Sequence, residues 1–117
     1  MENKKSEIKK EFGLIQKHPD DSLIRNFYSK SATIWIGSSY ASNRSYNDIK
    51  EYYDSKLKEH GWEFYKEEKM FDWGKDYGGK SLRYRKGEFV ATMQYAVVNA
   101  DYGWDYGFSM SYGFKYD

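Results

Sequence analysis

The stretch Trp-Asp-Tyr-Gly-Phe-Ser-Met-Ser-Tyr-Gly-Phe-Lys-Tyr, residues 104–116, carries a large apolar or aromatic side chain at every second position. The residues between them are small or polar. Because a β-strand directs successive side chains to opposite faces, this pattern predicts one strand with a bulky face and a nearly bare face. A helical period would scatter the aromatic rings around the axis. The bulky face has to be buried, so this segment decides the fold.

A helix predicted over residues 45–61 is the natural cover for the bulky face. Ser45, with Asp48 three residues later, resembles a capping box, and Gly61 is suited to end a helix. The positions between them form one stripe of mostly apolar side chains: Tyr46, Ile49, Tyr53, Leu57 and His60. A stripe at this spacing is typical of an amphipathic helix that packs on a sheet.

The remaining segments predict strands on both sides of this helix. Two precede it and four follow it, at about residues 23–28, 33–41, 62–69, 81–86, 88–98 and 104–116. The order ββαββββ indicates an α+β fold, an antiparallel sheet of five to six strands with one main helix on one face. Since the last strand is long for a chain of this size, we expect a bend or bulge at Gly107 or Gly113, or a free end.

The N-terminal segment is expected to be either a tether or a short amphipathic helix. Residues 4–12 carry Ile8 and Phe12 on one side, and Ile15 continues that stripe beyond Gly13, a plausible residue to follow the helix end. We treat residues 1–17 as this segment and residues 18–117 as the core of a single domain. The slightly favoured arrangement places the apolar side chains of this segment across the second face of the sheet.

Composition excludes several classes of protein. The chain has 117 residues, with 19 basic and 18 acidic side chains and a net charge of +1. A charge so close to zero argues against binding nucleic acid or an anionic membrane. Cysteine is absent, so disulfides and zinc–sulfur sites are excluded. The sequence contains neither an apolar run as long as a membrane span nor a signal-peptide core, so any membrane contact would need an anchor missing from this chain.

Three sequence features suggest a nucleotide, metal or RNA site, but the surrounding sequence does not support any of them. Residues 74–81 match the P-loop pattern G-x-x-x-x-G-K-[ST], but an alternating strand pattern follows where a P-loop needs a helix, so we interpret them as a flexible hairpin loop. His18 and His60 are far apart, without metal-ligand spacing. Residues 83–86 with Tyr65 suggest an RNA-binding platform, but residues 86–90 only loosely resemble the strand of such a platform, the order of helix and strands differs, and the net charge is near zero. We therefore predict no catalytic residues, no cofactor and no metal.

The second sheet face is the candidate surface for a ligand or partner. If Trp104 and Phe108 face the helix, aromatic and aliphatic side chains of other strands lie beside the small residues of the last strand. Such a surface suits a peptide, a glycan or a partner protein, or weak pairing with a second copy. The candidate residues are Trp35, Tyr65, Ser109 and Ser111, with Val90 and Val98 nearby and with Trp73 and Tyr77 from the presumed loop.

Residues 40–62 carry a resemblance. Tyr40 is followed by Ser45-Tyr46-x-x-Ile49-x-x-Tyr52-Tyr53-x-x-x-Leu57-x-x-x-Gly61-Trp62. This resembles a pattern common in small bacterial domains of uncharacterised role, tethered outside the membrane by a lipoprotein or single-helix anchor. The resemblance implies a helix followed by an antiparallel sheet and an extracytoplasmic location, but no activity. The chain departs from the pattern by lacking a lipid-bearing cysteine and an apolar leader.

These observations predict a non-enzymatic interaction domain, the soluble part of an anchored bacterial surface protein. The alternative is a small intracellular binding protein, such as an immunity protein that blocks a toxin, in which case the location is cytoplasmic. An enzyme would need a pocket with converging carboxylates or histidines, which the sequence does not indicate.

Overall fold

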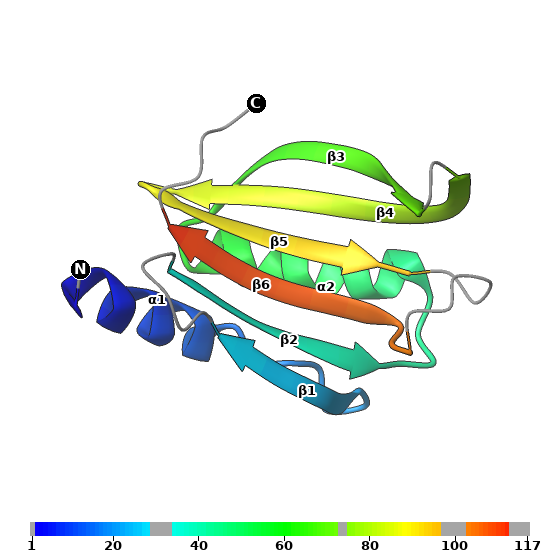
Figure 1. Cartoon of the computed structure of the whole chain (residues 1–117), viewed down its shortest axis with the longest axis horizontal. Helices are drawn as coiled ribbons and strands as arrows, with labels where there is room; N and C mark the ends of the chain where they lie inside the picture. The colour runs from blue at the N-terminus through cyan, green and yellow to red at the C-terminus, as the bar shows by residue number, and fades with distance from the viewer. Residues whose placement is uncertain (1, 29–33, 73–74, 97–102, 113–117) are drawn as a thin grey trace.

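The computed structural model describes residues 2–28, 34–72, 75–96 and 103–112, with the backbone alone for residues 2, 3, 70–72 and 75–78. Within these ranges the chain forms two helices and a six-stranded antiparallel sheet (Figure 1), which confirms the predicted α+β class. The elements are α1 (Glu2–Leu14), β1 (Ser22–Tyr28), β2 (Trp35–Ala41), α2 (Tyr46–Glu59), β3 (Glu63–Asp72), β4 (Lys75–Lys86), β5 (Phe89–Tyr95) and β6 (Tyr106–Tyr112). The strand order is β1-β2-β6-β5-β4-β3. Neither helix, as far as the described residues show, is long and apolar enough to cross a membrane.

Strand β6 lies in the middle of the sheet, between β2 and β5. Its bulky side chains Tyr106, Phe108 and Met110 are at most 1% exposed, which confirms the predicted two-sided strand. The strand is shorter than predicted, because it begins at Tyr106, while residues 113–117 lie outside the described residues. Its pairing with both neighbours runs without a shift across Gly107, so the bulge expected there is absent.

Helix α2 covers the bulky face, as predicted, and lies behind the sheet in Figure 1. The Ser45 side chain accepts a hydrogen bond from the Asp48 backbone N–H at 3.1 Å, which caps the first turn. At the other end Gly61 has a φ of +89°, and the Trp62 N–H donates to the Leu57 carbonyl at 2.9 Å. This is a Schellman motif, and the left-handed conformation explains the glycine. The buried face of the helix consists of Ile49, Tyr53 and Leu57.

Helix α1 packs on the same face as α2, so the expectation that it crosses the second face is wrong. Ile8 and Ile15 are buried in the same core, and the Phe12 ring stacks on Phe108 with centroids 5.7 Å apart. One helix is too narrow to cover a six-stranded sheet, and α1 buries the part of the bulky face along β2 and β6. The helix also continues through Gly13, which we expected to follow its end.

Residues 75–81 belong to β4, so the interpretation of residues 74–81 as a flexible hairpin loop is wrong. Their partners lie on β3, with Asp76 opposite Phe71 and Ser81 opposite Glu68. Gly78 and Gly79 lie where the register shifts between the pairs Lys69–Lys80 and Phe71–Asp76, a position at which glycine is tolerated within a strand. A strand at this position also lacks the helix N-terminus that a P-loop uses to hold phosphate.

The buried carboxylate of Asp21 connects three parts of the chain. Its carboxylate accepts hydrogen bonds of 2.6 Å from Ser42 Oγ, Arg44 Nη2 and Tyr106 Oη. Burial opposes ionisation of Asp21, but hydrogen bonds from Arg44, Ser42 and Tyr106 outweigh it and lower its pKa to about 2. The ionised side chain therefore links the segment before β1 and the segment before α2 to the start of β6.

Candidate functional site

The second face of the sheet carries the small residues predicted from the sequence. Three cross-strand rows run from β2 through β6 to β5, and each row is set by the pairing of one residue from each strand. The rows are Trp35–Ser111–Val90, Gly37–Ser109–Thr92 and Ser39–Gly107–Gln94. Because alternate residues of the same strands face the helices, these rows belong to the opposite face. The small side chains therefore form a low strip along the centre of the sheet.

A hollow of about 470 Å³ lies over this strip. Phe27 and Trp35 line it on the side of β1 and β2, and Tyr65 and Arg83 line it on the side of β3 and β4. The polar side chains that β5 and β6 contribute to the lining are Thr92, Gln94, Ser109 and Ser111. The volume falls within the range of about 300–1,000 Å³ that is typical of small-molecule sites.

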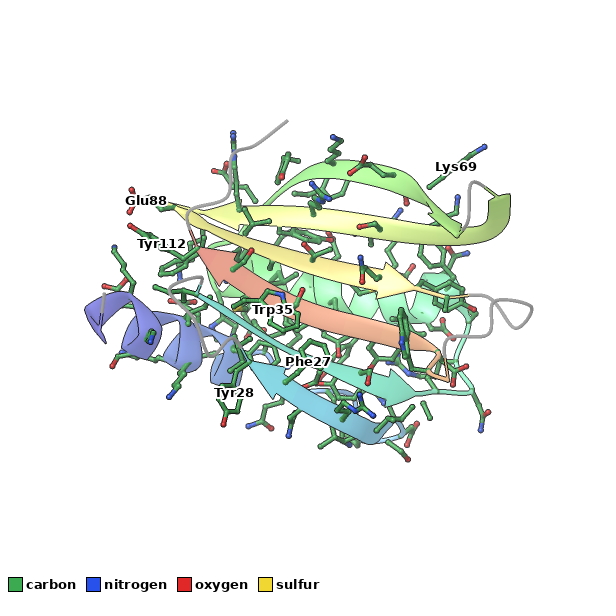
Figure 2. The ribbon with its side chains drawn as sticks, in the orientation of Figure 1. Phe27, Tyr28, Trp35, Lys69, Glu88 and Tyr112 are labelled. Atoms are coloured by element: carbon green, nitrogen blue, oxygen red, sulfur yellow. The ribbon has the colours of Figure 1, made fainter. Side chains whose placement is uncertain are left out.

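The wall beside β2 is a stacked aromatic pair. The rings of Phe27 and Trp35 have centroids 4.6 Å apart and planes at 17°, and their labelled side chains lie next to each other in Figure 2. Gly37 makes room for this pair, because a Cβ there would come within 2.5 Å of the Phe27 ring and 2.9 Å of Ser109 Cβ. The glycine is thus required by a close approach across the sheet.

The opposite wall is aromatic and cationic. Tyr65 sits at a break in the β3–β4 register, between Phe64 and Lys66, and the Arg85 guanidinium lies 5.8 Å from its ring centroid. Arg83 is directly opposite Thr92 in the β4–β5 pairing. Its Nε is buried without a hydrogen bond among the described residues, and the Glu68 Oε1 atom lies 3.6 Å from it.

The structure brings four of the six predicted residues together around this hollow: Trp35, Tyr65, Ser109 and Ser111. Of the other two, Trp73 lies outside the described residues, and the backbone of Tyr77 belongs to β4 while its side chain is not described. Val90 lines the hollow as well, whereas Val98 falls outside the described ranges.

Phe27, Arg83, Thr92 and Gln94 also line the hollow and were not predicted to do so from the sequence. Alternation within residues 88–98 contained a usable signal, because Thr92 and Gln94 are in phase with Val90. Phe27 carried no such signal, since its position depends on pairing with Gly37 on another strand.

The side chains that line the hollow are suited to binding a ligand. Among its described lining residues, the ionisable side chains are Tyr65 and Arg83. Within the described ranges, no group of three or more His, Cys, Asp or Glu residues is placed to hold a metal ion. The lining therefore offers aromatic faces for stacking, hydroxyl and amide groups for hydrogen bonds, and one guanidinium.

Comparisons with known proteins identify no relative of this chain. No protein-family model matches the chain, and neither the curated proteins nor the solved structures contain a match. The resemblance of residues 40–62 to anchored bacterial domains thus stays a prediction.

Proposed function

We propose that this protein is a non-catalytic binding domain that takes a small polar ligand in the hollow on the second sheet face. The observation that carries the proposal is the convergence of Phe27, Trp35 and Tyr65 with the hydroxyl groups of Ser109 and Ser111 around one volume. Apolar walls with a few well-placed polar groups are the usual composition of a small-molecule site.

The position of the hollow favours a ligand held by side chains over an added β-strand. Both edges of β6 are already paired, with β2 on one side and β5 on the other. An extended peptide gains most of its affinity from the free edge of a sheet, and the hollow offers none. Aromatic rings and hydroxyls are the available contacts.

Protein-observed NMR tests this proposal with a panel of maltotriose, chitotriose, trigalacturonic acid and tetraglutamate at millimolar concentration. We expect at least one probe to shift the signals of Thr92, Ser109 and the Trp35 indole. Thr92→Phe fills the hollow and should abolish these shifts, whereas Ser55→Phe, on the exposed side of α2, should leave them unchanged. Shifts that map to α2, or no shifts with any probe, contradict the proposal.

We propose, on the resemblance of residues 40–62 alone, that the domain acts outside the cytoplasmic membrane. Fractionation of cells that express the native gene tests this location. Recovery of the protein with the membrane or the extracellular fraction supports it, and recovery in the cytosol contradicts it and favours the intracellular alternative.

A further inference from the structure

We infer that the ligand of the hollow is an acidic sugar, a pyranose that carries a carboxylate. The inference depends on the proposed binding function and adds the chemical class of the ligand. Three features of the lining carry it: a stacked aromatic wall, a hydroxyl-bearing floor and a guanidinium as the charged group.

The aromatic wall suits the apolar side of a sugar ring. The stacked Phe27 and Trp35 rings are nearly parallel and half-buried. The face of an aromatic ring is electron-rich, so it attracts the polarised C–H groups on one side of a pyranose. Gly37 lets the Phe27 ring lie close to the sheet, which positions the pair against the strip of small residues.

The floor suits the hydroxyl groups of the same ring. Ser109 and Thr92 are direct partners in the β5–β6 pairing, and Ser111 lies two residues further along β6. Hydroxyl side chains both donate and accept, and neighbouring strands are about 4.8 Å apart. This spacing lets two of them contact different hydroxyls of one sugar ring.

The positive charge of Arg83 in the lining favours a ligand that carries a carboxylate. Arg83 is the charged residue among the described lining residues, and it lies directly across from Thr92. A guanidinium binds a carboxylate through two parallel hydrogen bonds. Glu68, which forms an ion pair with Arg83, is not part of the lining, and its Oε1 is 3.6 Å from Arg83 Nε, too far for a hydrogen bond.

The lining disfavours other anions. A phosphate-rich ligand such as a nucleic acid would be met by several cationic side chains, and the described lining contains one. An extended acidic peptide would need a free strand edge, and the strands beneath the hollow, β2, β6 and β5, are each paired on both sides. A single carboxylate on a hydroxylated ring matches all three features.

The test compares trigalacturonic acid with its methyl ester, which keeps the rings and removes the charge, by calorimetric titration. We expect the acid to bind roughly ten- to a hundred-fold more tightly, the range for a hydrogen bond to a charged group. Arg83→Gln should reduce the affinity for the acid to that for the ester and leave the ester unaffected. Arg83→Lys should retain part of the preference, because the charge remains and the two-pronged geometry is lost.

Arg25→Gln is the matched control. Arg25 lies on the same face of the sheet, is exposed and is not part of the lining, so this variant loses the same charge and should keep the preference. Thermal unfolding of every variant confirms that it is folded.

The outcomes separate this inference from the proposed function. Equal affinity for acid and ester, with no effect of Arg83→Gln, overturns the acidic sugar and leaves the binding domain standing. Tighter binding of tetraglutamate than of trigalacturonic acid at the same residues replaces the sugar with a peptide. If no probe in the panel binds, both the acidic-sugar inference and the proposed binding function are overturned.

Discussion

At the scale of single residues, Asp21 shows how a buried charge can be stabilising. Its carboxylate is fully shielded from solvent, and Arg44, which pairs with it, is 15% exposed. Ser42 and Tyr106 supply further hydrogen bonds, so the lone pairs of the carboxylate are satisfied. A buried ion pair contributes to stability only when such additional partners are present.

We predict that Asp21→Asn lowers the free energy of unfolding by about 3 kcal/mol at neutral pH, because it leaves the Arg44 charge without its partner. Urea unfolding followed by circular dichroism measures the change. Asp20→Asn is the control, since the neighbouring side chain is 77% exposed and its replacement should change stability little. Equal effects of the two substitutions would contradict the role of Asp21.

The comparison of the wild type with Asp21→Asn also gives a prediction about the pH dependence of stability. The pKa of Asp21 is about 2 in the folded chain and near 3.8 when unperturbed, so the unfolded chain takes up the proton first as the pH falls. The stabilisation is therefore complete above about pH 5 and is lost progressively between about pH 5 and pH 2. The difference in unfolding free energy between the wild type and Asp21→Asn should be constant from neutral pH to about pH 5 and shrink progressively below it.

At the scale of elements, the capping residues at its two ends determine where α2 begins and ends. We predict that Ser45→Ala costs about 1 kcal/mol, because the Asp48 N–H loses its acceptor. Ser55→Ala, at an exposed position in the middle of the same helix, should be neutral or slightly stabilising, since alanine has the higher helix propensity. Chemical denaturation of both variants measures the difference, and a loss of the same size in both would rule out capping as the cause.

At the scale of the whole molecule, α1 is part of the core rather than a tether. Ile8 and Phe12 of the helix and Ile15 just after it pack in the core, and the Lys86 ammonium at the end of β4 donates a hydrogen bond to Glu11 at 3.0 Å. The two helices together cover one face of the sheet and leave the other face to the hollow. The location of the candidate site thus follows from where α1 packs.

We predict that Ile8→Ala lowers the free energy of unfolding by about 2–5 kcal/mol, as other large-to-small core substitutions do. Leu14→Ala in the same helix, where the side chain is 44% exposed, should change it by less than about 0.5 kcal/mol. Thermal and urea unfolding compare the two variants. A neutral Ile8→Ala would mean that residues 1–17 act only as a tether.

The sequence by itself determined the two-sided strand of β6, the caps and buried stripe of α2 and the α+β class. It also placed Trp35, Tyr65, Ser109 and Ser111 on one face. These features follow from patterns within short segments, because the strand period, the helix period and the capping groups involve residues close together in the chain.

Only the tertiary structure decided the strand order, the face that α1 covers, the length of β4, the burial of Asp21 and the entry of Phe27 and Arg83 into the hollow. Most of these depend on contacts between residues that are far apart in the chain: Ile36 pairs with Met110, and Gly37 must be small because Phe27 of another strand lies over it. Local periodicity specifies which side of an element is apolar but not which distant element will bury it, and that choice is made by the packing of the whole chain.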